Sequence, residues 1–268
     1  MGILNATPDS FSDGGRLQSV TQIGGFRVSV DRALQLAEIM LGQGASIIDV
    51  GGESTRPGAS PVSELEEMER VLPVVEAIAT RLDIAISVDT SSPLVMEHAI
   101  AAGAGLINDV RALGRQGAME IAAPSAAAVC LMHMRGQPLT MQEQAEYGSV
   151  VDEVLAFLEQ RIVVCEKAGI ERGRLLVDPG FGFGKTLAHN YELLRHLDRL
   201  QVLGLPVLVG LSRKSMIGNV TGRDVEHRLS GGLAATVHAI LKGATIIRTH
   251  DVAQTVDAIK VHCAIMSD

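Results

Sequence analysis

The chain has 268 residues, of which 47% are hydrophobic and 3% aromatic, and its formal net charge at pH 7 is -8. Aliphatic side chains must therefore fill a core that is large enough for a complete α/β domain. The acidic balance and the lack of a basic cluster argue against a nucleic-acid-binding protein. The longest stretch without a charged residue, 121–134, contains Pro124 and is too short to span a bilayer, and the chain start lacks the features of a signal peptide.

The cysteines give a prediction about the cellular compartment. Cys130, Cys165 and Cys263 are odd in number and scattered, and they show neither metal-binding nor redox spacing. This pattern indicates reduced, buried thiols in a cytoplasmic protein.

A short apolar run, GILN at residues 2–5, opens the chain and leads into a long polar loop, ATPDSFSDGG. Ordering such a loop costs about 1–2 kcal/mol per residue, which suggests a loop that closes on a ligand. Further apolar runs rich in Val, Ile and Leu follow, and each ends on polar residues. Such runs are typical of strands that are covered on both faces. They lie at residues 2–5, 46–54, 84–90, 105–110, 127–134, 175–180, 206–215 and 244–250.

Amphipathic patterns between these runs predict helices, with glycines where the helices should end. The clearest patterns cover residues 30–43, 63–81, 150–168 and 225–242, whereas residues 116–124 give only a short helix. Eight strands alternating with helices predict the α/β class and a (β/α)8 TIM barrel, as a single domain over residues 1–268. Residues 16–29 exceed the expected length of a connection, and we expect a surface excursion there.

Polar residues cluster at the carboxyl ends of all eight predicted strands. In a (β/α)8 barrel, this face holds the active site. A single strand-end polar residue can equally cap a helix or bind a loop amide, but the repetition at every strand favours a functional site. The residues are Asn5, Asp49, Glu53, Asp89, Asn108, Asp109, His133, Asp178, Ser212, Lys214, Arg248 and His250.

Three of these residues suit a flat heterocycle. Asp89, Asn108 and Asp178 come from different strands and are expected to point into one cavity, where buried carboxylates need donors. An amino-pyrimidinone edge supplies paired N–H donors, and Lys214 can donate to a ring carbonyl or nitrogen. The residue types leave an alternative open: the two aspartates could instead bind a metal or accept from Lys214 and Arg248.

A second cluster is cationic and consists of Arg56, Arg213, Lys214, Arg248 and His250. The last two predicted strands of such a barrel usually carry the phosphate site, and an arginine fork binds phosphate oxygens at two points. We expect Arg213 to be a solvated surface charge, whereas Arg248 lies within an apolar run and needs a partner. The sequence contains neither a Walker motif nor a dinucleotide fingerprint.

Over essentially its whole length, the chain resembles bacterial dihydropteroate synthases. The resemblance lies in long, irregular stretches. They are GILNATPDSFSDGG, IIDVGGESTRPGA, SVDT, IND, CLMHM, LLVDPGFGFGKTLAHNYELL, LVGLSRKSMIG, RLSGGLAA and IIRTHDV. The resemblance implies a transferase that condenses 6-hydroxymethyl-7,8-dihydropterin pyrophosphate with p-aminobenzoate, giving 7,8-dihydropteroate and pyrophosphate in folate biosynthesis. It further implies Mg²⁺ as cofactor, a cytoplasmic homodimer, and a target of sulfonamides.

The resemblance also assigns roles to residues. It places the pterin pocket at Asp89, Asn108, Met132, Asp178 and Lys214. It places the pyrophosphate anchors at Asn5, Arg248 and His250, with Mg²⁺ on Asn5. It implies two mobile loops over the site, with Asp9 and Phe11 on the first and Thr55, Arg56 and Pro57 on the second. The p-aminobenzoate pocket is expected at Phe183, Lys214 and Ser215, and the catalytic set at Asn5, Arg56, Lys214, Arg248 and His250.

Two other classes of function compete with this prediction. A pterin- or folate-binding barrel of a methyltransferase would not need the STRPG and SRKS motifs, which are present here. A catalytically silent paralogue would not need to retain Asn5, Arg56, Lys214 and Arg248. The expected chemistry needs no strong base, so we expect no Ser-His-Asp triad.

Family members normally have a segment before MGILN that covers the barrel bottom, and a start inside the first strand is expected to affect stability more than site chemistry.

Overall fold

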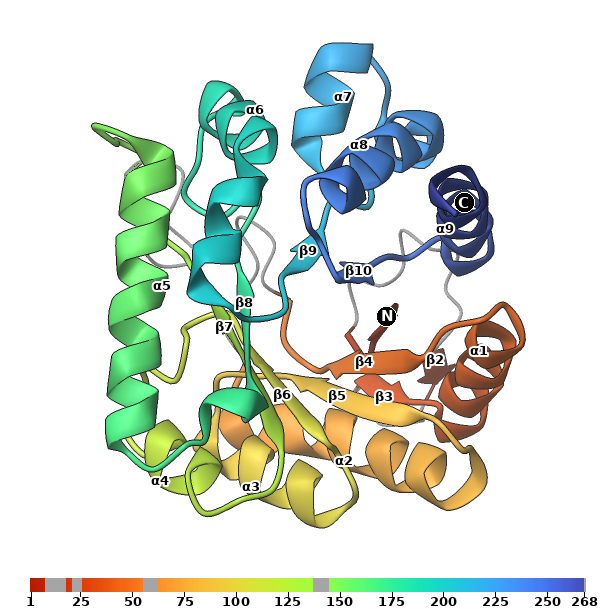
Figure 1. Ribbon diagram of the computed structural model, residues 1–268. Helices are drawn as coiled ribbons and strands as arrows, with labels where there is room; N and C mark the ends of the chain where they lie inside the picture. The colour runs from red at the N-terminus through yellow and green to blue at the C-terminus, as the bar shows by residue number, and fades with distance from the viewer. Residues whose placement is uncertain (8–17, 21–25, 55–61, 137–144, 268) are drawn as a thin grey trace.

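The computed structural model describes residues 1–7, 18–20, 26–54, 62–136 and 145–267. Within these residues, eight parallel strands form the inner ring (Figure 1). They are β1 (Gly2–Asn5), β4 (Ile47–Gly51), β5 (Ala85–Asp89), β6 (Leu106–Asp109), β7 (Ala128–Met132), β8 (Leu175–Asp178), β9 (Leu208–Gly210) and β10 (Ile246–Arg248). All eight predicted strands are confirmed.

Two single bridges close the ring. Ladders join the strands in the order β1-β4-β5-β6-β7-β8, and a separate ladder joins β9 to β10. Val177 bridges to Val207, and Gly2 bridges to Thr249, each in parallel. At the second closure, the Ile3 amide donates to the Thr249 carbonyl over 3.1 Å. The fold is therefore a (β/α)8 TIM barrel, as predicted.

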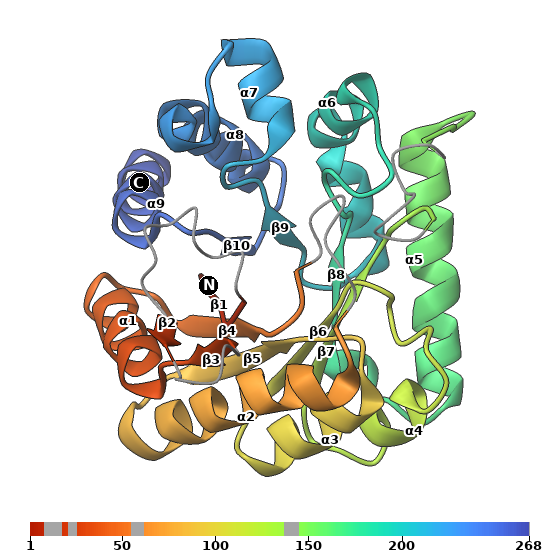
Figure 2. The ribbon, with the colours of Figure 1, turned by 180° about the vertical axis from the view of Figure 1, so that it is seen from behind.

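The helices surround the strands, as the opposite views of Figures 1 and 2 show. They are α1 (Val30–Gly42), α2 (Glu64–Arg81), α3 (Pro93–Ala101), α4 (Ala118–Ala122), α5 (Val150–Lys167), α6 (Leu187–Arg195), α7 (Ser215–Thr221), α8 (Leu229–Leu241) and α9 (Val252–Met266). The predicted helices are confirmed with small shifts of their ends. The largest shift is at α8, because the 3₁₀ turn Val225–His227 precedes it.

Side-chain caps fix several helix starts. The hydroxyls of Ser29, Ser63, Ser92 and Ser149 each accept a hydrogen bond from a backbone amide in the first turn of α1, α2, α3 and α5. At α6, Thr186 and His189 cap each other's backbone amides. These bonds satisfy amides that a helix start leaves without partners.

The predicted surface excursion contains a small hairpin. Strand β2 (Gln18–Val20) pairs antiparallel with β3 (Phe26–Val28). The barrel strands do not pair with this hairpin within the part of the chain that the structure describes. The helix α1 follows at Val30, so the extra residues lie between the first barrel strand and its helix.

The hydrophobic core has two parts. The larger part lies between strands and helices, and the smaller part, Leu106, Cys130, Leu176 and Leu208, lies inside the ring and is at most 8% exposed. Side chains alternate along a strand, so the interior residues two positions further on also point into the ring, nearer the carboxyl ends. The inner cluster therefore lies below the side chains at the carboxyl ends of the strands, and the part of the barrel interior that these side chains line is called the cavity below. No described helix is long and apolar enough to cross a membrane.

Candidate active site at the carboxyl ends of the strands

Arg248 bridges two carboxylates inside the barrel. Its Nε donates to Oδ2 of Asp49 over 2.6 Å, and its Nη2 donates to Oδ2 of Asp89 over 2.7 Å. Asp49 is fully buried, and the side chain of Asp89 is 14% exposed. Burial raises the pKa of Asp89, and the charge of Arg248 opposes this shift. Burial alone would lower the pKa of Arg248, but the charges of Asp49 and Asp89 raise it.

Asp178 lies on the same cavity, at the end of β8. The amide of Gly180 donates to its Oδ1 over 2.7 Å, and the other carboxylate oxygen accepts no hydrogen bond from a described residue. Burial raises the pKa of Asp178, and the Lys214 ammonium opposes the shift. Asp178 therefore offers a buried acceptor to a ligand that carries N–H donors.

Asn108 and Met132 complete this part of the cavity. Nδ2 of Asn108 donates to Oδ2 of Asp49 over 3.1 Å. In the ladders, Asn108 pairs with Asp89, and Met132 pairs with Asp178. The register thus places Asp89 beside Asn108 and Met132 beside Asp178, whereas Lys214 follows β9 outside the ladders.

Lys214 lies beside this cavity and contacts the glycine-rich segment after β8. It precedes α7, and its Nζ donates to the carbonyl of Phe181 and lies 4.8 Å from the centre of the Phe183 ring. Burial lowers the pKa of Lys214 to about 8, while Asp178 opposes the shift. Ser215 is exposed at the start of α7. The structure therefore brings Phe183 and Lys214 together, and Ser215 follows Lys214 directly in the chain.

A second lysine fixes the glycine-rich loop after β8. Lys185 is 3% exposed, and its Nζ donates to the carbonyls of Gly180 and Phe183 over 2.9 and 3.1 Å. The same Nζ lies 3.0 Å from Nδ1 of His133, which sits at the end of β7. Burial lowers the pKa of Lys185 to about 7 and that of His133 to about 3. A Cβ atom at Gly180 would lie 1.9 Å from the His133 carbonyl oxygen, so this close contact requires glycine.

Some strand-end residues serve the fold, against the broad prediction. His133 packs edge-on against Phe157, with ring centres 5.0 Å apart, and contacts Lys185. Asp109 accepts hydrogen bonds from the amides of Arg111 and Leu113, which fix its own turn. These side chains bind to neighbouring parts of the fold, because a sharp turn after a strand needs an acceptor for its amides.

The prediction that Arg213 is a solvated surface charge is wrong. Its Nη2 lies 2.8 Å from Oδ1 of Asp251, and its side chain is 30% exposed. Asp251 comes from the start of α9, which tertiary structure brings next to the turn after β9.

The remaining predicted residues fall into two groups. The side chain of Asn5, at the end of β1, makes no hydrogen bond to a described residue, and His250 contacts Ser212 through Nδ1 at 3.1 Å. The residues Asp9, Phe11, Thr55, Arg56 and Pro57 lie outside the described part of the chain.

Sequence reasoning also missed members of the site. The sequence pattern identifies Asp49 only as a strand-end residue and assigns it no role in the pocket. Its Oδ1 is buried without a hydrogen-bond partner among the described residues. The signal was available, since Asp49 interrupts a buried apolar strand, where an unpaired charge is expensive. Lys185 gives no such signal, because its partners, the carbonyls of Gly180 and Phe183 and the His133 ring, are brought to it only by the fold.

The chain matches the model of a known family and full-length relatives. Residues 1–250 match the family described as "Pterin binding enzyme". The chain is 52% identical over 267 residues to the dihydropteroate synthase of Escherichia coli K12, covering 100% of this chain and 91% of the relative. This chain and the relative therefore correspond over nearly their full lengths.

Solved structures show the same fold. A Yersinia pestis dihydropteroate synthase in a sulfonamide drug complex has a TM-score of 0.94 and 51% identity, over 100% of this chain and 94% of that one. A Xanthomonas albilineans dihydropteroate synthase with 4-aminobenzoic acid has a TM-score of 0.90 and 48% identity, over 100% and 93%.

Buried carboxylates, an amide and two cations lie at the carboxyl end of this TIM barrel. Such a site is suited to a polar heterocycle. The chain belongs to the pterin-binding enzyme family. Within that family its activity is that of the dihydropteroate synthases. It is a transferase of folate biosynthesis, which condenses 6-hydroxymethyl-7,8-dihydropterin pyrophosphate with p-aminobenzoate to 7,8-dihydropteroate and pyrophosphate.

Proposed function

We propose that the barrel cavity binds the pterin ring through Asp89, Asn108 and Asp178. The observation that supports this assignment is the buried Asp178 carboxylate, with one oxygen held by Gly180 and the other available to a ligand. An amino-pyrimidinone edge presents two adjacent N–H donors, and a carboxylate can accept both. Met132, 3% exposed on the neighbouring strand, supplies an apolar contact for the ring.

We assign the p-aminobenzoate pocket to Phe183, Lys214 and Ser215. The Phe183 ring supplies an apolar face, and Lys214 and Ser215 are positioned to meet a carboxylate. Phe11, Asp9 and Pro57 are proposed to enclose this substrate from the two loops. The relative crystallised with 4-aminobenzoic acid supports the class of ligand.

We assign the pyrophosphate site to Asn5, Arg248 and His250, with Thr55 and Arg56 on the second loop. Arg248 and His250 lie at and just after the end of β10, where barrels of this class commonly bind phosphate. Arginine in this position can hold phosphate oxygens through two N–H groups while Nε remains on Asp49.

The residues present fit Mg²⁺ as cofactor. The described residues contain no cluster of three or more His, Cys, Asp or Glu side chains that could hold a metal ion. Mg²⁺ commonly binds one or two protein oxygens and completes its shell with water and substrate phosphates. Asn5 offers such an oxygen, since its side chain makes no hydrogen bond to a described residue. When bound, Mg²⁺ would neutralise charge on the leaving pyrophosphate.

The side chains then act by electrostatics and positioning. Loss of pyrophosphate from the pterin methylene carbon develops positive charge towards the ring, and the Asp89 and Asp178 carboxylates favour this charge. Arg248 and His250 stabilise the departing anion. The aryl amine of p-aminobenzoate is neutral at pH 7 and attacks the carbon without a strong general base.

Release of pyrophosphate tests the assignment. We expect turnover with both substrates and Mg²⁺, and loss of turnover when Mg²⁺ is removed with a chelator. Arg248→Met should lower kcat/KM for the pterin pyrophosphate by about tenfold or more, because a charge-assisted contact is worth roughly 1.5–3 kcal/mol. Transfer of a methyl group from a folate, with no pyrophosphate released, would contradict the assignment.

We further propose that residues 1–268 form one pterin-binding domain, which assembles as a homodimer in the cytoplasm. Free Cys130, Cys165 and Cys263 support a reducing compartment. Exposed Val220 and Leu241, on α7 and α8, support an interface on the later helices. Sedimentation equilibrium measures the assembly state.

A further inference from the structure

The turn between β9 and α7, residues 211–214, is strained at Arg213. Its φ angle is 60°, in the left-handed region that side chains disfavour. The Lys214 amide donates to the Leu211 carbonyl over 3.3 Å and closes the turn. The strained residue directly precedes Lys214, and Ser215 begins α7. A change of the Arg213 backbone would therefore displace both residues.

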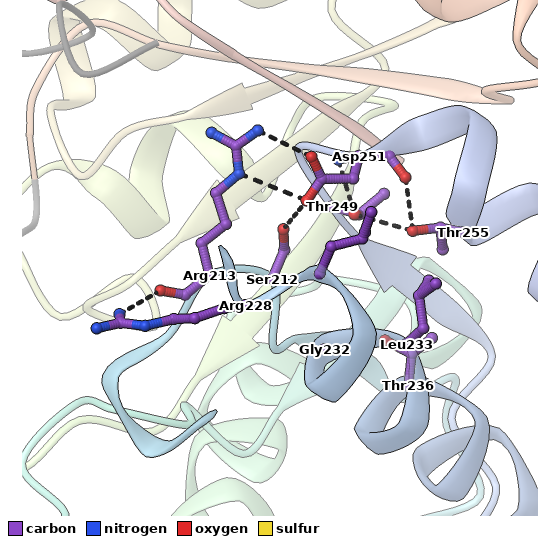
Figure 3. A pocket seen from close by; sticks show the side chains of 10 residues that line it. Ser212, Arg213, Arg228, Gly232, Leu233, Thr236, Thr249, Asp251 and Thr255 are labelled. Atoms are coloured by element: carbon purple, nitrogen blue, oxygen red, sulfur yellow. Dashed lines mark hydrogen bonds and ion pairs between the residues drawn. The ribbon is translucent and has the colours of Figure 1, made fainter. Parts of the chain in front are cut away.

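Asp251 holds the strained residue in place (Figure 3). Its Oδ1 accepts from Nη2 of Arg213 over 2.8 Å, and its Oδ2 accepts from Nε over 3.4 Å, so the guanidinium is bound at two points. On the other side, Nη1 of Arg228 donates to the Arg213 carbonyl over 2.9 Å. Both the side chain and the backbone of Arg213 are thus tied to neighbouring elements.

Asp251 itself is fixed at the start of α9. Its amide donates to Oγ1 of Thr249 over 3.1 Å, and its carbonyl accepts from Oγ1 of Thr255 over 2.8 Å. Figure 3 shows these bonds on the side of Asp251 that faces away from Arg213. The carboxylate is therefore a rigid anchor for the β9–α7 turn.

The same carboxylate reaches His250 through Ser212. Oγ of Ser212 lies 3.4 Å from Oδ2 of Asp251, 3.2 Å from the His250 amide and 3.1 Å from His250 Nδ1. A hydroxyl donates one hydrogen bond and accepts two, and the carboxylate can only accept. The Ser212 hydroxyl therefore donates to Asp251, and it accepts from both the backbone amide and the Nδ1 of His250. This places a hydrogen on Nδ1 of His250.

These contacts differ from those of a nucleophilic triad. In a triad, the carboxylate orients the histidine, and the histidine takes the proton of the serine. Here the carboxylate holds the serine, and the serine accepts from the histidine. Ser212 is a connector in this arrangement, in agreement with a reaction that needs no serine nucleophile.

We propose that Asp251 is a positioning residue for the condensation. Through Arg213 it holds the turn that places Lys214 and Ser215, and through Ser212 it orients the His250 ring. One carboxylate thus sets the relative position of the p-aminobenzoate and pyrophosphate sites. The inference rests on the roles proposed above for Lys214, Ser215 and His250.

Four proteins test the Arg213 connection: the wild type, Asp251→Asn, Arg213→Gly and the double variant. Asp251→Asn should raise the KM for p-aminobenzoate about tenfold, because the strained turn loses its charged partner. Glycine adopts a φ of 60° without steric cost. Arg213→Gly should therefore restore the KM of the Asp251→Asn protein to within about threefold of the wild type.

Glu166→Gln is the matched control, since it removes the carboxylate charge of an exposed ion pair with Arg172, N···O 3.1 Å, and should leave the KM unchanged. An Asp251→Asn protein with wild-type kinetics would overturn the proposal. So would a double variant whose rise in KM equals the product of the rises caused by Asp251→Asn and Arg213→Gly alone. Absence of pyrophosphate release by the wild type would overturn the assigned activity itself.

The ¹⁵N shifts of the His250 ring give a second readout that does not depend on turnover. The wild type should show the Nδ1–H tautomer at pH 8, and Asp251→Asn should shift the ring towards the Nε2–H form, because an amide can donate to Ser212 and free its hydrogen. Ser212→Ala keeps the Arg213 pair but breaks this link. It should change the tautomer while leaving the KM for p-aminobenzoate within about twofold. The same tautomer in all three proteins would contradict the His250 part of the proposal.

Discussion

Arg248 sets the charge balance of the cavity at the scale of a single residue. Asp49 and Asp89 each accept a hydrogen bond from Arg248. The charges of Asp49, Asp89 and Asp178 all raise the pKa of Arg248. Without the guanidinium, the fully buried Asp49 carboxylate would lose a partner at 2.6 Å. An uncompensated buried charge is strongly unfavourable, so these carboxylates and the arginine form one unit. In the proposed function, this unit lies beside the carboxylates that receive the donor-rich ring.

Asp178→Asn tests pterin recognition. The amide keeps an acceptor for the Gly180 amide but loses the charge, and one of its ends presents donors to donors on the ring. Calorimetric affinity for a pterin should fall about tenfold or more, since a charge-assisted bond contributes roughly 1.5–3 kcal/mol. Asp198→Asn, which removes an exposed carboxylate paired with Lys242, is the control and should leave affinity unchanged. Equal affinity in both variants would show that the ring binds elsewhere.

The cysteines give a second prediction at this scale. Burial raises the pKa of Cys130 well above its usual value and that of Cys165 to about 11, whereas Cys263 is exposed. Only the thiolate reacts. A disulfide reagent at pH 8 should therefore label one thiol per native chain rapidly, at Cys263, and three after denaturation. Rapid labelling of Cys130 in the native protein would contradict its burial inside the barrel.

At the scale of an element, the first turn of α2 contains a buried carboxyl group. Glu67 is 3% exposed, and its Oε1 has no hydrogen-bond partner among the described residues. Burial raises the pKa of Glu67 to about 7. The folded protein therefore holds this proton between pH 4.5 and 7, while the unfolded chain releases it. Stability must fall as the pH rises through this window.

Glu67→Gln should remove this penalty, because the amide does not ionise. At pH 8 the variant should be more stable than the wild type by about 2–3 kcal/mol in chemical denaturation, and at pH 4.5 the two should be nearly equal. Glu69→Gln changes an exposed carboxylate on the same helix and should show no such dependence on pH. A stability difference that is the same at both pH values would refute the protonation account.

At the scale of the whole molecule, the proposed p-aminobenzoate pocket depends on several elements at once. Phe183 follows β8, Lys214 and Ser215 follow β9, and the other predicted members lie outside the described residues. Lys214 also donates to the Phe181 carbonyl, so its ammonium has an internal partner before a substrate arrives. Pyrophosphate binding at Arg248 and His250 is expected to order the loops and complete the pocket.

Binding should therefore follow an order. By calorimetry, p-aminobenzoate should bind weakly or undetectably alone, and tightly once a pterin-site ligand, pyrophosphate and Mg²⁺ are present. Arg56→Ala should weaken this coupling more than it weakens pterin binding, whereas Arg195→Ala, an exposed cation on α6, should change neither. Equal affinity of p-aminobenzoate for the free protein would contradict the ordered mechanism.

The sequence by itself determined the strands, most helices and the end of the barrel at which the polar strand-end residues gather. These features are local, since apolar runs, glycine stops and strand-end polar residues are repeated along the chain with a regular spacing. The motifs around Asp178, Lys214 and Arg248 also identified the family before any contact was known.

Only the tertiary structure decided which of these polar residues face the cavity. His133 and Asp109 bind their own loops, Asp49 joins the site, and Arg213 is paired rather than solvated. The partners lie far apart in the chain: Arg248 meets Asp49 199 positions away, and Arg213 meets Asp251 38 positions away. Charge and hydrogen-bond partners depend on distances of a few ångströms between strands, and those distances are set by closure of the barrel.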